Sequence, residues 1–354
     1  MLLVVSVLGF VACGSSGDSE DMSPSGNLTA VNLTDDGYYD GMLYYQITSN
    51  SPQEVSITKA NQSVQTVNTP ASVVIEGNQY KCTGIGDGAF ANCKNLVSLT
   101  ISDNILSIGD VAFRGCTKLA SVVLPKQLSK INHYAFDGCT SLTSIVIPEN
   151  VTAIEEGAFQ DCKSLANITI SNISTFVYPE AFQGCKSLIS LSFHGIFIGD
   201  RAFRDCSSLQ NVDIEYPVFC IGEEAFANCG ISTINIKYAT FIGQNALSGC
   251  KWLKSVHIKR TPPRLFSYLT YSLDSFESNA FESGTYSYDA KQTTGGGYAT
   301  IGNGYTFSYK SWVMEQSVIA DNATSSNAVL YVSKDYIDEY KSSDWRIFSQ
   351  IVEE

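Results

Sequence analysis

Hydrophobic residues recur along residues 81–260 in a unit of about 23 residues that is repeated eight times. Each unit contains Ala-Phe-x-x-Cys, or Ala-Leu-x-x-Cys in the last one, followed by spaced aliphatic positions. The cysteines of this motif are Cys93, Cys116, Cys139, Cys162, Cys185, Cys206, Cys229 and Cys250, with steps of 23, 23, 23, 23, 21, 23 and 21 residues. A fixed period of this length predicts a solenoid, in which each repeat forms one coil of a stack.

Within one unit, apolar and polar positions alternate as they do in a strand with one buried face. Between Cys139 and Cys162, the apolar positions are Leu142, Ile145, Ile147, Val151, Ile154, Ala158 and Phe159. Leu142, Ile145 and Ile147 follow the pattern L-x-x-I-x-I, whose last three residues have the two-residue period of a strand. We therefore expect each coil to place one short strand beside the strand of the next coil.

These motifs resemble those of the BspA-like leucine-rich repeat proteins. The resemblance rests on C-x-x-L-x-x-[LIV]-x-[ILF], a V/I-x-x-I step and A-F-x-x-C. It extends to "TPP" at 261–263, "NAF" at 279–281 and the tail from Leu330, which is similar to the closing module of that family. The resemblance implies a β-rich α/β solenoid, a right-handed leucine-rich repeat stack of about eight coils of 21 to 23 residues. It also implies β caps and a small C-terminal helix.

The resemblance and the composition divide the chain into six segments. We expect a signal peptide (1–12), an acidic Ser/Gly-rich lipoprotein tether (13–26), an N-terminal β cap (27–80), the repeats (81–260), an irregular Tyr/Ser/Gly-rich insert (261–328) and a closing module (329–354). In the cap, "SVVIEGNQYKCTGI" predicts two strands around Gly77 and Asn78. The Asp-Gly pairs at 36–37 and 40–41 could supply calcium ligands, but they are more typical of hairpin turns.

The first residues join an apolar run to a cysteine and then to an acidic stretch. Phe10 to Cys13 resembles a bacterial lipobox, which implies that Cys13 becomes the lipidated first residue after signal cleavage. The alternative is an ordinary secretory signal with an incidental cysteine. The apolar run is too short to span a bilayer as a helix. Because the first basic residue is Lys59, the positive n-region is missing, and we expect the translation start to lie further upstream.

Eight of the eleven cysteines occupy one column of the repeat, which is the behaviour of a small buried apolar residue. Equivalent positions in stacked coils lie about 5 Å apart, but their parallel side-chain vectors do not suit disulfide geometry. We therefore expect buried free thiols. Cys82 and Cys220 lie outside the column, and the repeat pattern does not explain them.

Charge and motifs narrow the possible functions. The formal net charge is -13 and no run of Lys or Arg is present, which disfavours nucleic acid as a partner. His133, His194 and His257 are three coils apart, about 15 Å, so no two can share a metal ion. The sequence contains no H-E-x-x-H, G-x-S-x-G, C-x-x-C or P-loop pattern. We therefore expect no enzymatic activity, no cofactor and no metal.

Aromatic residues gather in the later repeats and in the insert, whereas no aromatic stripe crosses the outward columns of the predicted strands, one of which is small and polar throughout. The candidate ligand-binding residues are Phe197, Tyr216, Phe219, Tyr238, Phe241, Trp252, Tyr286, Tyr288, Tyr298 and Tyr305. An exposed apolar patch would bind a partner, but bulky residues could equally fill the core of the shortened repeats. The insert could likewise be a recognition loop or a hairpin that covers the edge of the last coil.

We expect a non-enzymatic lipoprotein of the outer membrane and cell surface that meets the membrane only through its lipid anchor. The acidic stretch after Cys13 resembles the export tethers of Bacteroides surface lipoproteins. The BspA-like resemblance implies adhesion to an extracellular protein, either a host matrix protein such as fibronectin or fibrinogen or the surface of another bacterium. A glycan ligand and a structural role without a defined ligand are the alternatives.

Overall fold

The structure is a computed structural model that describes most of the chain from residue 29 onward. The described residues are 29–214, 218–236, 239, 241–243, 245–258, 264–266, 268–271, 288–293, 296–301, 305–310, 328–342 and 350–353. The predicted signal peptide and tether, with Cys13, lie outside them. For Thr29, Ala30, Phe241 and the strands between residues 264 and 310, the structure describes the backbone only.

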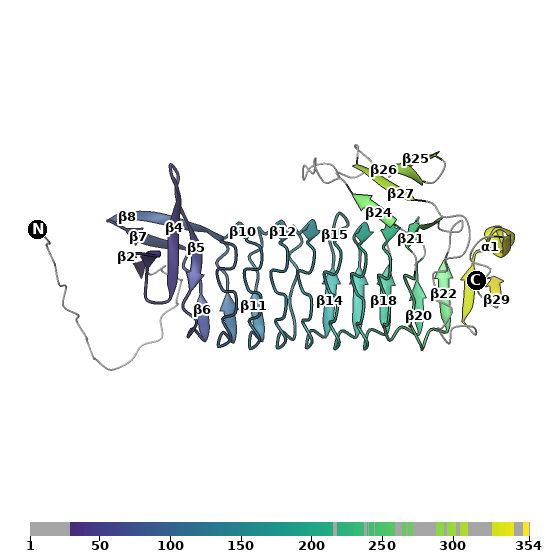
Figure 1. The fold of residues 1–354 in the computed structure, drawn as a ribbon, viewed down its shortest axis with the longest axis horizontal. Helices are drawn as coiled ribbons and strands as arrows, with labels where there is room; N and C mark the ends of the chain where they lie inside the picture. The colour runs from purple at the N-terminus through teal and green to yellow at the C-terminus, as the bar shows by residue number, and fades with distance from the viewer. Residues whose placement is uncertain are drawn as a thin grey trace, which may run out of the picture.

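An eight-stranded sheet forms the amino-terminal end of the molecule (Figure 1). Seven of its strands run in the order β1-β7-β8-β5-β4-β3-β2, and these are β1 (Thr29–Ala30), β2 (Asn32–Thr34), β3 (Gly37–Tyr39), β4 (Leu43–Asn50), β5 (Gln53–Ala60), β7 (Ser72–Ile75) and β8 (Asn78–Ile85). The β7–β8 hairpin turns at Glu76 and Gly77, which have φ of 49° and 80°. The turn thus lies one residue before the predicted one, because two consecutive positive φ angles favour Gly at the second position. The pair at 36–37 lies at the β2–β3 hairpin turn, as the turn interpretation expects.

Beyond this sheet the chain forms a β-solenoid of about nine stacked coils (Figure 1). A first parallel ladder consists of β6 (Thr66–Asn68), β9 (Ser98–Thr100), β11 (Ser121–Val123), β14 (Asn167–Ile170), β16 (Ser190–Phe193), β18 (Asn211–Ile214), β20 (Thr233–Asn235), β22 (Ser255–Ile258), β28 (Val329–Val332) and β29 (Gln350–Glu353). A second ladder begins with β10 (Ser107–Ile108), which pairs with β8 as the eighth strand of the amino-terminal sheet. Its following strands form a separate parallel sheet of β12 (Lys130–Ile131), β13 (Ala153–Ile154), β15 (Phe176–Val177), β17 (Phe197–Ile198), β19 (Cys220–Ile221), β21 (Phe241–Gly243) and β23 (Arg264–Phe266). The predicted strand-by-strand stacking is confirmed.

The first ladder weakens in the coil that contains Ser144, where only isolated bridges join Ser121, Ser144 and Asn167. In a later coil, the residue after the strand, His194, donates its backbone N–H to Ile170 O at 3.0 Å. The equivalent residues in the early coils are Pro125 and Pro148, which have no N–H to donate. Pro148 therefore removes one hydrogen bond from the pairing of that coil, whereas β11, before Pro125, keeps its regular pairing with β9.

The Ala-Phe-x-x-Cys motif forms a column of tight turns on the third side of each coil. The N–H of each repeat Phe donates to the repeat Ala carbonyl of the next coil, as from Phe136 to Ala158 at 2.8 Å. The residue before each Cys has a positive φ, and this column reads Asn92, Gly115, Gly138, Asp161, Gly184, Asp205, Asn228 and Gly249. Gly, Asn and Asp are the residues that tolerate this left-handed conformation best, which explains their choice.

Stacked Phe side chains form the centre of the core. The rings of Phe90, Phe113, Phe136, Phe159, Phe182, Phe203 and Phe226 are fully buried and stack with centroids 5.0 to 5.4 Å apart. Each repeat Cys from Cys116 onward donates its thiol to the Phe carbonyl of the preceding coil, at 3.1 to 3.3 Å. The prediction of buried free thiols is confirmed for the eight cysteines of the column, and Cys82 and Cys220 are also buried and free. This position of the repeat therefore favours a small residue that can also act as a weak hydrogen-bond donor.

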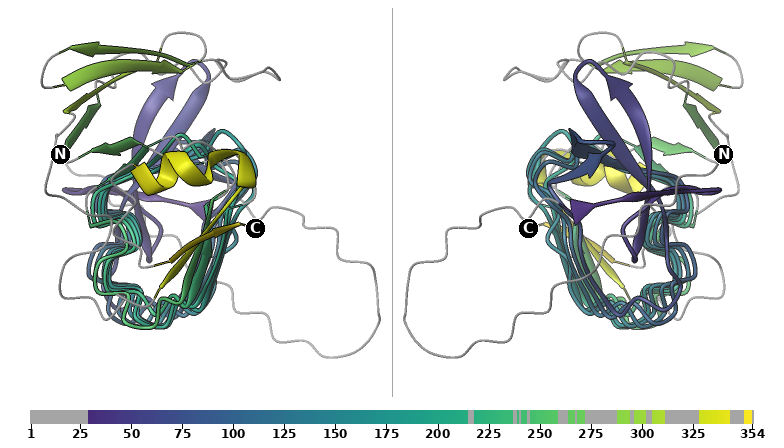
Figure 2. Two further views of the ribbon diagram at one scale, coloured as in Figure 1. Left: turned by 90° about the vertical axis from the view of Figure 1, so that its right-hand side faces the viewer. Right: turned by 90° about the vertical axis from the view of Figure 1, so that its left-hand side faces the viewer.

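Four antiparallel strands occupy part of the insert that we expect to be irregular. They run in the order β24-β27-β26-β25 and span β24 (Tyr268–Tyr271), β25 (Tyr288–Thr293), β26 (Gly296–Ile301) and β27 (Tyr305–Lys310). Figures 1 and 2 show this sheet outside the stack of coils. Alternation such as that in "YTFSYK" favours strand pairing, which accounts for the regular structure.

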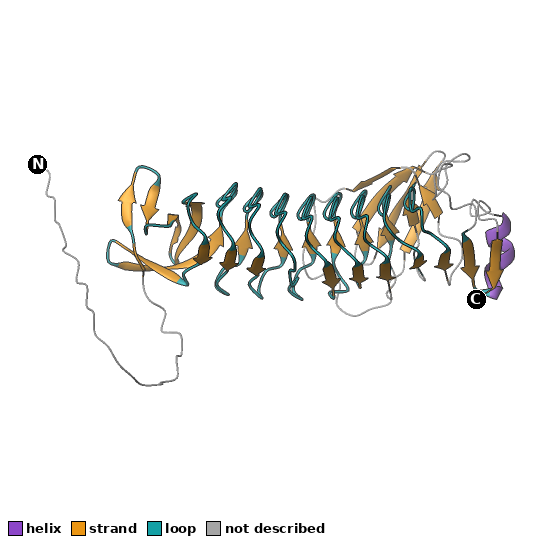
Figure 3. Ribbon diagram, turned by 90° about the horizontal axis from the view of Figure 1, so that it is seen from below, coloured by secondary structure: helices purple, strands orange, loops and turns teal. Residues whose placement is uncertain are grey.

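The chain then returns to the first ladder and closes the carboxyl end of the solenoid. After β28 come a 3-10 turn (Lys334–Tyr336) and the helix α1 (Ile337–Ser342), whose Tyr340 is buried. The last strand, β29, pairs in parallel with β28 (Figure 3). A β-rich solenoid with a β cap and one small C-terminal helix is therefore confirmed.

Candidate interaction surfaces

The outward face of the first ladder presents rows of small polar side chains. Burial in β14 and β18 alternates between exposed and buried residues, so every second side chain points away from the core. The first outward row is Ser98, Ser121, Ser144, Asn167, Ser190, Asn211, Thr233 and Ser255. Ser190 Oγ donates to Asn167 Oδ1 at 2.8 Å, and the hydroxyls of Thr233 and Ser255 lie 2.9 Å apart. Neighbouring strands thus link their side chains along the stack.

A second outward row contains two neighbouring apolar residues in its early part. It reads Thr100, Val123, Val146, Thr169, Ser192, Asp213, Asn235 and His257. Val123 is 60% exposed and Val146 is 82% exposed. They are neighbours in adjacent coils, because Ser121 bridges Ser144 two residues earlier in each coil. Two adjacent exposed valines on a polar face are a candidate contact point for a partner.

The same row gains an aromatic residue from beyond the insert. In β28, Tyr331 pairs with His257 of β22, and their rings stack with centroids 4.5 Å apart and planes 4° from parallel. Asn235 and Asp213 precede them in register on β20 and β18. Sequence reasoning did not include Tyr331, because the insert separates it from the repeats. The alternation shared by "SVHI" and "VLYV" is the signal that could have found it.

Of the ten predicted site residues, the structure describes the side chains of three. Phe197 and Phe219 are buried, whereas Trp252 is 69% exposed in a turn that precedes β22. Tyr216, Tyr238 and Tyr286 lie outside the described residues, and Phe241, Tyr288, Tyr298 and Tyr305 lie in strands β21, β25, β26 and β27. Tyr288 and Tyr305 share one cross-strand row, because both pair with Ile301.

Burial of Phe197 agrees with the interpretation that bulky residues fill space in the shortened repeats, whereas the buried Phe219 lies in the full-length repeat between Cys206 and Cys229. Gly195 marks the first shortening, and a Cβ there would come within 2.4 Å of Thr175 O and 2.7 Å of the Phe193 ring. Phe193 itself is fully buried. Neither Phe197 nor Phe219 presents its ring at the surface. Among the predicted residues whose side chains the structure describes, Trp252 is therefore the one that can contact a partner directly.

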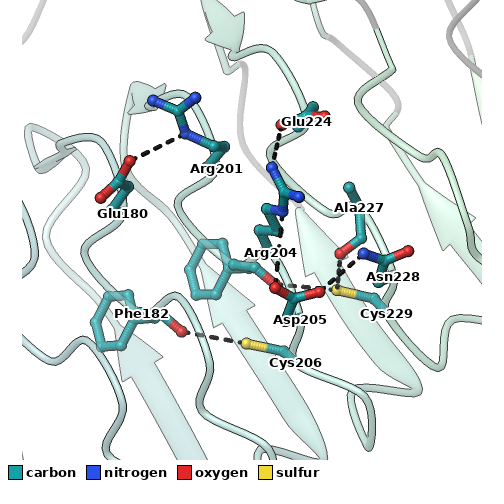
Figure 4. Close-up of polar contacts among 11 residues, drawn as sticks. Glu180, Phe182, Arg201, Arg204, Asp205, Cys206, Glu224, Ala227, Asn228 and Cys229 are labelled. Atoms are coloured by element: carbon teal, nitrogen blue, oxygen red, sulfur yellow. Dashed lines mark hydrogen bonds and ion pairs between the residues drawn. The ribbon is translucent and has the colours of Figure 1, made fainter. Parts of the chain in front are cut away.

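The turn side of the later coils carries closely balanced charges (Figure 4). Arg201 Nε lies 3.0 Å from Glu180 Oε1, and Arg204 Nη1 lies 2.5 Å from Glu224 Oε2 in the next coil. Asn228 donates to Asp205 Oδ1 at 2.8 Å. These contacts join consecutive coils, so the turn side is a network of cross-coil pairs rather than a surface of one charge.

The titratable groups of the core are held in their neutral form. Burial raises the pKa of Cys116 and Cys250 to about 12, and that of Cys93 to about 11. Thiols of this kind are unreactive, because the thiolate is the nucleophile and the metal ligand. Within the described ranges, no group of three or more His, Cys, Asp or Glu side chains could hold a metal ion. These ranges also contain no helix long and apolar enough to cross a membrane.

Comparisons with known proteins agree with this architecture. The family model for the BspA type leucine rich repeat region matches residues 69–189 and 181–289 in six copies. A leucine-rich repeat protein from Bacteroides ovatus has 25% sequence identity and a TM-score of 0.50, over 64% of this chain and 67% of that one. A leucine rich cell surface protein from Faecalibacterium prausnitzii has 25% identity and a TM-score of 0.48, over 85% and 71% of the two chains. No curated protein sequence matches the chain.

The chain belongs to the family of proteins with BspA type leucine rich repeats, since the family model covers more than half of its length. Membership in this family indicates a surface protein that acts through protein–protein contacts. Repeats of this type typically serve as non-enzymatic scaffolds.

Proposed function

We propose that the protein is a lipid-anchored adhesin of the outer membrane that binds an extracellular protein through the outward face of its first ladder. The partner is a host matrix protein, such as fibronectin or fibrinogen, or a protein on another bacterial surface. Cys13 carries the anchor, and the acidic segment after it holds the solenoid away from the membrane.

The exposed valines carry this proposal. Val123 and Val146 lie side by side at 60% and 82% exposure, among hydroxyl and amide side chains that can form hydrogen bonds with a partner. A small apolar centre within a polar rim is the usual composition of a protein-binding contact. The Asp213–Asn235–His257–Tyr331 row extends the same face toward the carboxyl end and supplies an aromatic anchor.

Binding of the purified chain to immobilised matrix proteins and to whole bacteria tests the proposal. Val146→Lys should weaken saturable binding at least about tenfold, because a charge at the apolar centre costs more than 1.4 kcal/mol. Leu106→Lys is the matched control, since Leu106 is 53% exposed but lies beside the second ladder. Unchanged binding of Val146→Lys, or equal loss in the control, would place the contact elsewhere.

The anchor has its own test. In a bacterial host supplied with labelled fatty acid, the wild-type chain should incorporate label and partition into the outer membrane fraction. Cys13→Ser should abolish both. Incorporation that persists in Cys13→Ser, or an unlabelled wild-type chain, would contradict the lipoprotein assignment without affecting the adhesion test.

A further inference from the structure

A polar hollow of about 390 Å³ lies on the turn side of the later coils. Half-buried Asp161, Gln183 and Asp205 line it together with the exposed Lys186 and Asn228. Figure 4 shows Asp205 and Asn228 joined by their hydrogen bond in this region. The hollow spans several coils, so its lining comes from equivalent positions of successive repeats.

Gly184 explains why the hollow exists at this place in the array. In the left-handed column before the repeat Cys, Gly184 lies between Asp161 and Asp205, with a φ of 75°. A Cβ at Gly184 would come within 2.8 Å of Asp161 Oδ1. Because this side chain is missing, a space remains between the carboxylates of the coils on either side.

Gln183 contributes an acceptor that the protein leaves unused. Its Oε1 atom is buried and has no hydrogen-bond partner in the described part of the chain. A buried amide oxygen without a donor costs free energy, and native structures contain few of them. Gln183 lines the hollow, so a turn of its half-buried side chain would bring this atom within reach of a ligand O–H or N–H group.

The existing ion pairs decide which ligand chemistry suits the hollow. Lys163 Nζ lies 3.6 Å from Asp161 Oδ1, and Arg204 Nε lies 3.7 Å from Asp205 Oδ2. A cationic ligand would have to compete with both of these cations. Hydroxyl groups need no net charge, and each can donate to a carboxylate or amide oxygen and accept from an ammonium or amide N–H. The volume also falls in the range of small-molecule sites.

We propose that this hollow binds a neutral polyhydroxylated ligand, such as the end of a glycan chain. Asp161 and Asp205 accept hydrogen bonds from its hydroxyls, Gln183 accepts another once its side chain turns toward the ligand, and Lys186 and Asn228 donate to them. The proposal does not rest on the protein adhesion argued above, because the hollow is on the turn side and the valines are on the outward face of the first ladder. Either can therefore fail without the other.

A glycan array probed with the intact chain, followed by calorimetric titration of the best-bound oligosaccharide, tests the proposal. Asp161→Asn and Asp205→Asn should each lower the affinity about tenfold, through loss of a charge-assisted hydrogen bond. Asn already occupies this left-handed column at Asn92 and Asn228, so both variants should fold. Lys186→Ala is a second test at an exposed position, and Asn92→Asp is the matched control in the same column outside the hollow.

Affinity that falls in the hollow variants but not in Asn92→Asp, at both low and high salt, supports the assignment. The assignment is overturned if no glycan on the array binds, or if Asp205→Asn and Lys186→Ala bind the oligosaccharide as tightly as the wild type does. An arginine-rich peptide that binds at low salt and is lost in Asp205→Asn would overturn the neutral character of the ligand.

Discussion

The outward positions of the second ladder differ sharply between the early and the late coils. In β10 and β12 the first residue of each strand is polar and exposed, namely Ser107 and Lys130. In β15, β17 and β19 the equivalent residues are Phe176, Phe197 and Cys220, and all three are buried. The inward residues of the same strands are aliphatic and buried in both halves.

This difference shows that the outer position of the same backbone repeat can hold either a solvent-exposed polar residue or a buried apolar one. The register from Phe176 through Phe197 and Cys220 to Phe241 is regular and parallel, so the strands pair in the same way although two of these coils are shortened to 21 residues. The rings of Phe176 and Phe197 lie 5.9 Å apart and form a second apolar layer outside the main core. The inward columns pack the coils against one another in both halves. The residue type of the outer column, in contrast, changes with its exposure to solvent.

The largest effect should come from the inward column that both halves share. Phe136→Ala in the early half and Phe203→Ala in the late half should each lower the free energy of unfolding by about 4 kcal/mol, because each removes a fully buried ring from the stack. Guanidinium denaturation followed by circular dichroism measures both. A loss in one half that is several times the loss in the other would mean that the two halves do not share one core.

Exchange of the outer column gives the most direct test of the comparison. Phe197→Ser should cost about 3 kcal/mol, since it removes a buried ring. The mirror change, Ser107→Phe, should alter stability by less than about 0.5 kcal/mol, since that position is exposed. Thermal denaturation of the two variants compares them. Equal shifts in melting temperature would show that the outer faces of the halves are energetically the same.

The cysteine column makes stability depend on pH in the alkaline range. Burial raises the pKa of Cys116 from its ordinary value of 9.0 to about 12 in the folded state. The unfolded chain therefore loses this proton first, and the stabilisation present below pH 9 is lost as the pH rises toward 12. Between pH 9 and pH 10.5, the free energy of unfolding of the wild type should fall by about 1 kcal/mol per pH unit more than that of Cys116→Ala. Identical slopes in urea denaturation would contradict burial of this thiol.

The smallest effect should come from the ion pairs of the late turn side. The side chains of Arg201 and Glu180 are 44% and 24% exposed, so solvent screens their pair. Arg201→Ala should cost about 0.5 kcal/mol or less, and 0.5 M salt should remove most of the difference. A loss above 2 kcal/mol in a denaturation titration would mean that these cross-coil pairs stabilise the late half in a way that the early half lacks.

Several features of the fold could be predicted from particular residues. The spacing of the repeat cysteines and the L-x-x-I-x-I pattern indicated the stack of coils and its inward strand residues, because burial of one face requires a regular period. The side chains of the cysteine column point in the same direction, which does not suit a disulfide, so free thiols could also be predicted. The hydrogen bond from each thiol to a Phe carbonyl could not be predicted, because it joins atoms of different coils.

The candidate surfaces were less predictable. Phe197 and Trp252 are both off-pattern aromatics in the sequence, yet one is buried and the other is 69% exposed. Tyr331 joins His257 only because β28 returns to the first ladder after the insert. The hollow beside Gly184 depends on the carboxylates of the neighbouring coils, which no local pattern places together.

The sequence by itself determined the repeat, its period and the residues that face the core, because these follow from local alternation between apolar and polar positions. Only the tertiary structure decided which outer positions are covered, which side chains meet across coils and where a space is left between them. The physical reason is that exposure and contact are properties of neighbouring coils, and a periodic sequence specifies the neighbours without specifying what surrounds them.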